Sequence, residues 1–405
     1  MFENIIGQPV VVGALRSELA QGRFPPSSLF FGPAYTGKLS TALETARALT
    51  CVSGEAAWSC DCHACRLQKD LSHPQTVLLG PRYSDVEIAA SADALLRSRK
   101  PAARHLLVRA VRKLTRRFDL SVADLDDSRV RGMQERVGQL EDLLAELPPE
   151  GELPPEARLA RLLERIVLAA APVAAQVRVD TIGIGQVRRL AAWSHLTSGD
   201  SRKIAILENA DRMQDSARNA LLKLLEEPPS SVSLILLSTR RAAIIATILS
   251  RLRPYSFASR GAEEEKEVLT KIFRREGEGF TGLRAFFLAW REINPEKLQL
   301  LARRFIELAR APAPAGVDIV QEMAELLPEG APRRGRSSRE TAVSFLEEVA
   351  AGIGALLREG ELPIAALERW SDALRDAAAR IESLNMQPAA VLEALFHRLR
   401  TEAAA

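Results

Sequence analysis

Three short runs of consecutive apolar residues stand out in a chain whose pattern is otherwise that of amphipathic helices. They lie at residues 28–31, 204–207 and 234–237, and turn-forming or polar residues flank each of them. Continuous apolar runs of this length are typical of parallel strands that are buried on both faces. Helical periodicity lies between the runs, which predicts a parallel sheet flanked by helices over residues 1–255. From about residue 262 onward the pattern predicts helices alone.

The same pattern divides the chain into several predicted parts. Residues 1–258 form an α/β domain with a small cysteine-rich module at about 51–65 and a charged helical insertion at about 83–178. Residues 259–405 are predicted to be helical, and breaks rich in proline, glycine or arginine interrupt them at 311–316 and 328–336. A length of 405 residues agrees with two or three domains.

Composition narrows the class of protein. Hydrophobic residues make up 47% and charged residues 26%, which excludes a wholly disordered or collagen-like chain. No stretch approaches the roughly 20 apolar residues of a membrane helix, and the N-terminus lacks a secretory signal. The net charge of +3 gives no global bias toward nucleic acid. All four cysteines lie between Cys51 and Cys65, so we expect a reducing cytoplasm rather than a secreted, disulfide-linked protein.

A candidate phosphate-binding loop follows the first apolar run. Gly32 to Lys38 has the pattern G-x-x-x-x-G-K between a predicted strand and a predicted helix. Glycines let backbone amides surround phosphate oxygens, and the lysine reaches the β- and γ-phosphates. Leu39 stands where a magnesium-binding Ser or Thr is expected, and Ser40 comes one residue too late, about 100° around the helix. The loop either binds nucleotide without the usual metal ligand or is a structural relic.

The end of the second apolar run has a related defect. Hydrolysis of ATP calls for an Asp–Glu pair there, but the chain has Glu208 and Asn209. An amide cannot accept a proton, so Asn209 cannot act as a general base, and Asp211 lies two residues further on. Together with Leu39, this predicts a poor ATPase or none.

The cysteines predict a metal site. Cys51, Cys60, Cys62 and Cys65 have the spacing C-x8-C-x-C-x2-C, and four thiols so close together suit tetrahedral zinc. Four protein ligands leave no open position, so the zinc would be structural. The short C-x-C spacing leaves open that His63 replaces one thiol, or that the site no longer holds metal.

These features together resemble the bacterial DNA polymerase III clamp-loader subunits of the AAA+ class, the gamma/tau and delta prime types. The most specific stretch is NALLKLLEEPP at 219–229, and the cysteine cluster follows the loop helix as in that family. Further similar stretches are 2–8, 29–38, 238–239, 248–252 and, weakly, 384–395. The resemblance implies an AAA+ domain at 1–258, a helical lid at 259–308 and a C-terminal helical collar at 309–405, with no counterpart for 83–178.

The resemblance also implies a function. Both site defects and the length favour a delta prime-like, non-hydrolysing subunit. Its Arg251 lies in Ser250-Arg251-Leu252, which matches the family's Ser-Arg-Cys motif except for Leu252, and the resemblance implies that it reaches a neighbour's ATP as a trans arginine finger. Partners would be gamma/tau and delta type subunits in a hetero-oligomeric ring, the sliding clamp and primed DNA, with no membrane. The residues implied to line the nucleotide site are Gly32, Gly37, Lys38, Ser40, Glu208 and Thr239. ATP binding stays open and hydrolysis is not expected.

Two alternatives remain open at this stage. One is an ATP-hydrolysing gamma/tau-type motor, with Glu208 or Asp211 standing in for the missing acid. The other is a nucleic-acid-binding adaptor on a degenerate ATPase fold. Nine Lys or Arg and no acidic residue lie between Arg97 and Arg117, and a basic stripe there could bind DNA or an acidic partner, or be a solvated face. The residues that make this stripe are Arg109, Arg112, Lys113 and Arg116.

Overall fold

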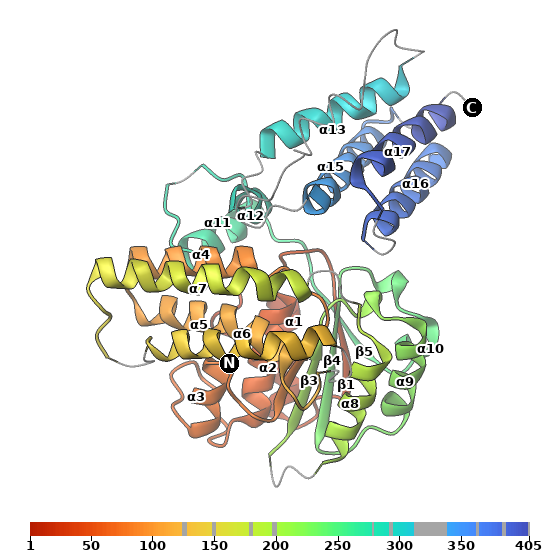
Figure 1. Ribbon diagram of the computed structural model, residues 1–405. Helices are drawn as coiled ribbons and strands as arrows, with labels where there is room; N and C mark the ends of the chain where they lie inside the picture. The colour runs from red at the N-terminus through yellow and green to blue at the C-terminus, as the bar shows by residue number, and fades with distance from the viewer. Residues whose placement is uncertain are drawn as a thin grey trace. The chain divides into compact units, whose positions relative to one another are not determined.

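The computed structural model describes two compact units, residues 1–284 and residues 285–405 (Figure 1). The described residues are 1–123, 128–147, 151–177, 181–196, 201–277, 279–290, 295–311, 338–361, 364–382 and 386–403. The predicted break at 328–336, nearly all of the break at 311–316, and the pair Leu384–Asn385 lie outside them. The domain boundaries at 258 and 308 stay predictions.

A five-stranded sheet forms the centre of the first unit. Its strands are all parallel, in the order β2-β3-β4-β1-β5. The bounds are β1 (Ser27–Phe31), β2 (Thr76–Leu79), β3 (Lys203–Leu207), β4 (Val232–Ser238) and β5 (Arg253–Ser256). The three predicted strands are the three central ones, because only strands covered on both faces and both sides require a continuous apolar run.

The sequence analysis missed the two edge strands for different reasons. In β5 only Tyr255 is buried, so the segment carries no apolar run. β2 is short, and it is buried although it lies at an edge. Arg116 covers it by donating hydrogen bonds to the carbonyl oxygens of His73 and Thr76. An edge strand that another part of the chain covers cannot be distinguished from a buried helix segment by its pattern alone.

Alternate residues of the central strands face opposite sides of the sheet, as the period of two requires. Phe30, Ile206 and Ile235 pack with helices α1 and α2. Leu207 and Leu236 pack with α8, α9 and α10 on the other side (Figure 1). Both faces are therefore closed by helices, and the predicted parallel sheet flanked by helices is confirmed.

The helices of the first unit fall before, between and after the strands. Their bounds are α1 (Pro9–Ala20), α2 (Lys38–Thr50), α3 (His63–Lys69), α4 (Asp85–Ser98), α5 (Pro101–Thr115), α6 (Ser128–Ala145), α7 (Glu156–Val177), α8 (Ile184–His195), α9 (Asp215–Glu226), α10 (Ala246–Leu249) and α11 (Ala262–Lys271). Three single 3₁₀ turns join them, η1 (Arg116–Phe118), η2 (Ala210–Arg212) and η3 (Arg241–Ala243).

Four of these helices, α4 to α7, form a bundle with an apolar core of its own. Leu95, Leu107, Val111 and Ile166 are fully buried there, one or more from each of three helices, and Leu140 joins them from α6. This α4–α7 bundle occupies the region predicted to be helical at about 83–178. Its core explains why the region is amphipathic rather than uniformly polar.

The second unit consists of helices alone in its described parts. They are α13 (Pro295–Arg310), α15 (Ser338–Arg358), α16 (Ile364–Glu382) and α17 (Pro388–Ala403), preceded by α12 (Leu283–Trp290) at the boundary. Trp370 is fully buried, and Phe305 makes edge-on ring contacts with Phe345 and Phe396. The predicted all-helical C-terminal region is thus confirmed for the part of the chain that the structure describes.

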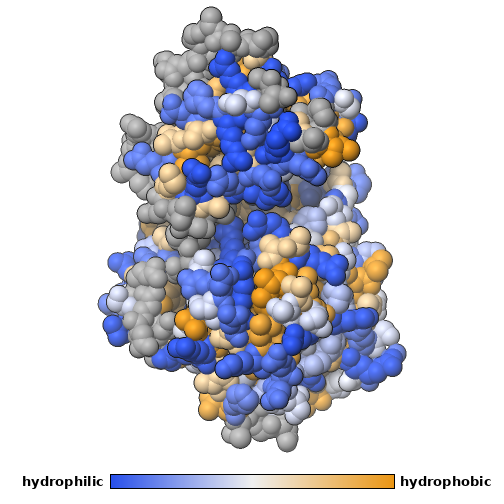
Figure 2. Space-filling model, turned by 90° about the vertical axis from the view of Figure 1, so that its right-hand side faces the viewer, coloured by the Kyte–Doolittle hydropathy of each residue, from blue (hydrophilic) through white to orange (hydrophobic). Residues whose placement is uncertain are grey.

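Polar and charged side chains cover most of the face shown in Figure 2, where apolar residues gather in a few separate groups. Among the described helices, none combines the length and the apolar character that crossing a membrane requires.

We predict that Gly80→Ala destabilises the first unit by at least about 1 kcal/mol. Gly80 ends β2 with a φ of +100°, and a Cβ there would lie 2.0 Å from the backbone oxygen of Glu208. Urea unfolding measures the effect. Gly13→Ala is the matched control because nothing lies within 4 Å of its Cβ position in α1, and helix propensity makes it neutral or stabilising. Equal stabilities of the two variants would contradict the prediction.

Candidate functional site

The parallel sheet brings the candidate residues to one edge. β1 and β3 lie on either side of β4, so their carboxyl ends are neighbours. The loop Gly32–Gly37 follows β1, Glu208 follows β3, and Ser238 ends β4. In open parallel sheets, ligands bind beside the carboxyl ends of the strands. The fold thus places the phosphate-loop candidates and the acidic candidates together.

The loop has the shape of a phosphate loop, but its lysine is turned back on it. Gly37 is left-handed, with a φ of 88°, and α2 begins at Lys38. The Lys38 ammonium donates to the carbonyl oxygen of Gly32 at 2.7 Å, to that of Pro33, and to the Thr36 hydroxyl at 3.3 Å. Burial lowers the pKa of Lys38 to about 8, although Glu208 and Asp211 raise it. The ammonium is therefore held by its own loop.

The positions after the lysine supply little for a metal ion. Leu39 is buried in the core beside α1, and Ser40 is half-buried one residue further along α2. Leu39, which stands where a magnesium-binding hydroxyl is expected, thus contributes to core packing in the fold. Nothing in the geometry tests the predicted role of Ser40.

Glu208 is enclosed by two arginines. It is 6% exposed. Arg82 Nη1 lies 2.6 Å from one carboxylate oxygen, and Arg117 Nη2 pairs with the other. Arg117 also donates to the carbonyl oxygen of Gly80 at 2.9 Å. Because permanent cations bind both of its oxygens, Glu208 is held as a structural anion and is poorly placed to act as a general base toward water.

A second carboxylate extends this arrangement into the α4–α7 bundle. Glu87 pairs with Arg82 at 2.5 Å and with Lys113 at 2.5 Å. Burial alone would raise the pKa of Glu87, but the two cations hold it at about 2. We call Arg82, Glu87, Lys113, Arg117 and Glu208 the Glu208 network. It joins α4, α5 and η1 to the end of β3.

The residues after Glu208 are engaged in the fold as well. Asn209 is left-handed, with a φ of 50°, and its amide donates to the carbonyl oxygen of Pro81 at 2.7 Å. Asp211 is buried, accepts from the Ser238 hydroxyl at 2.8 Å and pairs with Arg240 at 3.1 Å. Neither side chain is placed to replace the missing acid.

Two residues near the site were missed by the sequence analysis. The first is Ser238, which makes the buried contact to Asp211, whereas its neighbour Thr239, the residue predicted from the resemblance, is exposed. The second is Arg260, which lies against the phosphate loop. Its guanidinium donates to the carbonyl oxygens of Ile6 at 3.1 Å and of Tyr35. A single arginine far along the chain gives no sequence signal for such a contact.

Arg251 lies at the surface, after α10. Its guanidinium pairs with Glu226 of α9 at 2.7 Å and donates to the carbonyl oxygen of Thr247 at 2.7 Å. The side chain is about one-third exposed. It is ordered by these contacts and still accessible from outside the chain.

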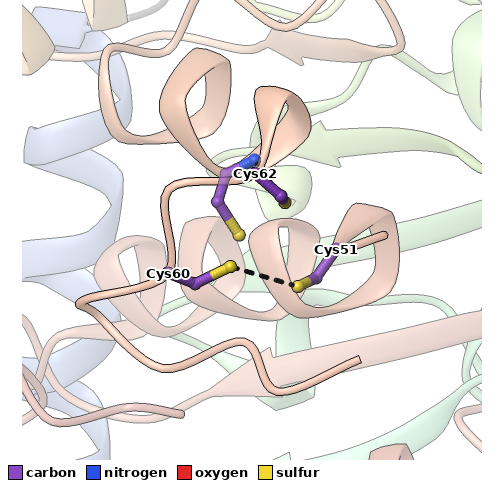
Figure 3. Close-up of side chains that lie close together, drawn as sticks. Cys51, Cys60 and Cys62 are labelled. Carbon is purple, nitrogen blue, oxygen red and sulfur yellow. Dashed lines mark hydrogen bonds between the residues drawn. The ribbon is translucent and has the colours of Figure 1, made fainter. Parts of the chain in front are cut away.

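The four cysteines meet in the loop between α2 and α3. Cys51 ends α2, Cys62 precedes α3, and Cys65 lies in its first turn. All four sulfur atoms lie within 4.8 Å of one another, and those of Cys51 and Cys60 are 3.9 Å apart (Figure 3). A tetrahedral zinc site needs an edge of about 3.8 Å, given Zn–S bonds of about 2.3 Å. The cluster can hold a metal ion through cysteines alone, and the C-x-C spacing does not prevent it.

The thiols differ in acidity. Although burial raises it, backbone N–H groups of Cys65 and Val52 lower the pKa of Cys62 to about 6. Burial raises the pKa of Cys65 far above that of a free thiol, with the other cysteines adding to the effect. Cys62 is therefore the thiol that supplies a thiolate to an incoming metal ion most readily.

The comparisons with known proteins now decide the family. A family model described as "DNA polymerase III, delta subunit" matches residues 7–125 and 155–260, more than half of the chain. The chain belongs to this family. The predicted resemblance to clamp-loader subunits of the AAA+ class is thereby confirmed.

Three curated relatives are named "DNA polymerase III subunit delta'". The protein of Haemophilus influenzae is 28% identical over 29% of this chain and 44% of its own length. That of Yersinia pestis is 40% identical over 18% of this chain and 22% of its own. That of Pseudomonas aeruginosa is 36% identical over 22% of this chain and 28% of its own. The chain spans less than half of the length of each of these relatives.

The family model matches the chain in two segments that are separated within the α4–α7 bundle. Only residues 126–154 separate its two matched segments. The unmatched part is therefore shorter than the insertion predicted at about 83–178, and α4, α5 and α7 lie within residues that the family model covers.

The basic stripe of this delta subunit family member is neither a solvated face nor a free DNA surface. Arg109, Lys113 and Arg117 follow one another at helical spacing, and each is buried against a different acid. These acids are Glu44 of α2, Glu87 of α4 and Glu208 after β3, respectively. The part of this surface at 109–117 is therefore not free to bind a nucleic acid, because intramolecular carboxylates take the place of phosphates.

The two half-exposed members of the predicted stripe are paired as well. Arg112 pairs with Glu141 at 3.1 Å, and Arg116 with Asp119 at 2.9 Å.

We predict that Glu87 contributes stability that acid removes. Its folded-state pKa is about 2, below the ordinary 4.5, so its contribution is present above about pH 4.5 and is lost as the pH falls toward 2. Glu87→Gln should cost about 3 kcal/mol at pH 7 by leaving Arg82 and Lys113 without their anion. The difference from wild type should shrink below pH 4.5.

Urea unfolding between pH 7 and pH 3 measures this difference. Glu164→Gln, at an exposed position of α7, is the control and should follow the wild type at every pH. A Glu87→Gln difference that is constant with pH would contradict the prediction.

Proposed function

We propose that this chain is a non-hydrolysing, delta prime-like subunit of a clamp-loader complex. The observation that carries the proposal is the enclosure of Glu208 by Arg82 and Arg117. This is the position at which an ATPase needs a carboxylate that is free to hold the metal ion, and Asn209, which follows it, cannot take a proton from water. The replacement of the magnesium-binding hydroxyl by Leu39, which packs in the core, supports the same conclusion.

ATP binding at the loop would require a change at Lys38. Its ammonium would have to exchange the oxygens of Gly32, Pro33 and Thr36 for phosphate oxygens. Hydrolysis would in addition require Glu208 to leave both arginines. ATP binding therefore requires fewer contacts to be broken than ATP hydrolysis does. We propose that the loop binds nucleotide at most, through Gly32, Gly37 and Lys38 together with Ser40 and Thr239.

We propose Arg251 as a trans arginine finger for the ATP site of a neighbouring subunit. A guanidinium beside the γ-phosphate neutralises charge that builds during phosphoryl transfer. Arg251 is accessible, and Glu226 holds it near the surface without burying it. The chain would thereby activate an ATP site that it does not itself contain.

The assembly that follows from this role is a hetero-oligomeric ring with gamma/tau and delta type subunits. In it, residues 259–308 would act as the lid and 309–405 as the collar. The ring would open a sliding clamp and close it on primed DNA in the cytoplasm. The delta prime names of the relatives support this assignment.

We also propose that the cysteine cluster holds structural zinc. The metal ion would cross-link the end of α2 to the start of α3. Cys51, Cys60, Cys62 and Cys65 would supply the ligands, since their sulfur atoms lie within 4.8 Å of one another.

We predict no ATP turnover above background by the isolated chain, with or without primed DNA, because Glu208 is not available. A coupled phosphate-release assay measures it, and Lys38→Ala should change nothing. DNA-stimulated turnover that Lys38→Ala abolishes would instead identify a gamma/tau-type motor and end the proposal.

We predict that Arg251→Ala lowers turnover at the neighbouring site of the assembled loader by roughly 10³-fold. Phosphate release is measured in a loader whose other ATP sites carry phosphate-loop lysine substitutions. Arg253→Ala is the control, since Arg253 is an exposed arginine two residues away. Equal turnover in the two assembled variants would refute the finger role.

We predict about one zinc ion per purified chain, bound by the four thiols. Metal analysis by mass spectrometry should show that Cys65→Ser loses the ion, because three thiols remain. His63→Ala should retain it, since the sulfur atoms complete the tetrahedron without the exposed His63. Loss of zinc from His63→Ala would show that the imidazole is a ligand.

A further inference from the structure

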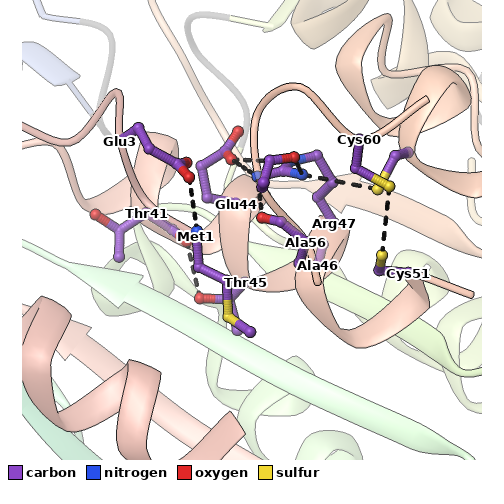
Figure 4. A network of polar contacts seen from close by, with 12 residues as sticks. Met1, Glu3, Thr41, Glu44, Thr45, Ala46, Arg47, Cys51, Ala56 and Cys60 are labelled. Carbon is purple, nitrogen blue, oxygen red and sulfur yellow. Dashed lines mark hydrogen bonds and ion pairs between the residues drawn. The ribbon is translucent and has the colours of Figure 1, made fainter. Parts of the chain in front are cut away.

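One arginine of the phosphate-loop helix is buried against the cysteine module. Arg47 of α2 is 1% exposed, and Figure 4 shows it beside Glu44 and the cysteines. Its guanidinium donates to Glu44 at 2.9 Å and to the carbonyl oxygens of Ala56 and Ala57 at 2.9 and 2.8 Å. The last two contacts fix the loop that carries the cysteines.

The same guanidinium reaches one of the sulfur atoms. Arg47 Nη1 lies 3.7 Å from Cys65 Sγ, and Cys65 is the fully buried member of the cluster. Four thiolates around a divalent ion leave a net charge of about −2 in a partly buried site. Uncompensated charge is costly away from water, and groups beyond the ligands set the affinity of a metal site. Arg47 is the cation in position to offset this charge.

Glu44 connects Arg47 to the α4–α7 bundle. It is 1% exposed and binds Arg47 through one carboxylate oxygen. Its other oxygen accepts from Arg109 of α5 at 3.2 Å. One buried carboxylate therefore holds one arginine from each side.

Trp58 of the cysteine loop lies at the same junction. The cations of Arg47, Lys69 and Arg109 lie 5.6, 5.7 and 6.0 Å from its ring centre. Lys69 is paired with Asp61 of the cysteine loop at 3.0 Å. His105 of α5 also contacts the ring. The α5 helix thus docks on the cysteine loop itself, and the order of that loop and the docking of α5 depend on each other.

We propose that Arg47 is a positioning residue for the metal centre, and that it couples metal loading through Glu44 to the docking of α5 by Arg109. The inference rests on the proposed metal binding by the cysteines. With the ion bound, the loop is fixed and Arg47 is drawn to the thiolates, so Glu44 is presented to Arg109 in one orientation. Without the ion, no bonds join the four sulfur atoms, so the loop is less constrained and this orientation of Glu44 is weakened.

The first test measures zinc affinity of the full chain by competition with a chromophoric chelator. Arg47→Met should weaken zinc binding by about 10- to 100-fold, and Arg47→Lys, which keeps the charge but not the fork of donors, by less. Arg66→Met is the control, because Arg66 is exposed although it adjoins Cys65 in sequence, and it should stay within about twofold of wild type.

The two proposals fail in different ways. Absence of zinc from the wild type overturns the metal site and this inference with it. Zinc bound equally well by the wild type and by both Arg47 variants overturns the inference alone. Arg47→Lys keeps the test decisive if Arg47→Met does not fold, since its circular dichroism and affinity are measured on the same sample.

The second test follows the docking of α5 by hydrogen exchange, with zinc bound and after its removal. In the wild type, removal of zinc should lower the protection of the backbone amides of residues 101–115, which include Arg109. The reference is residues 156–177, which belong to the same bundle but do not include Arg109. In Arg109→Met the protection of 101–115 should no longer respond to zinc. Protection of α5 that is independent of zinc in the wild type would refute the coupling.

Discussion

The buried ion pair between Glu208 and its two arginines is the interaction on which the rest of the site depends. The carboxylate of Glu208 at the end of β3 is buried, and its ion pairs with Arg82 and Arg117 offset the loss of hydration. Removing one partner of such a pair costs about 3–5 kcal/mol, because an uncompensated charge stays behind. The end of the central strand and the α4–α7 bundle therefore hold each other in place.

Similar buried ion pairs recur along the α4–α7 bundle, and they hold neighbouring elements in place. Three basic residues at helical spacing bind acids of three different elements: Arg109, Lys113 and Arg117. Their ion pairs fix α2, α4 and the end of β3 relative to one another. A bundle fixed in this way uses the ATPase acid as a structural anion. It also contacts the cysteine module through Arg109 and His105, so the bundle is joined both to the end of β3 and to the cysteine loop that follows α2.

Sequence patterns identified what depends on local order. The central strands, the glycine loop, the four cysteines and the helical C-terminal region all follow from apolar runs or from spacing within a few residues. The edge strand β5 could not be predicted from such a run, since it buries a single side chain, that of Tyr255. The contacts of Arg260 and Ser238 could not be predicted either. Their partners lie on other elements, and an isolated arginine or serine has many possible environments.

The sequence by itself determined the class of the protein, the defect after the loop lysine and the four cysteines that can hold a metal ion. Each of these is a statement about which chemical groups are present and how far apart they lie along the chain. Only the tertiary structure decided that the residues of the basic stripe are paired with acids of the same chain and that Glu208 is paired with two arginines. A charged residue has the same helical spacing whether water or a carboxylate faces it, and the partner that settles its role, such as Glu44 for Arg109, lies 65 residues away in the chain.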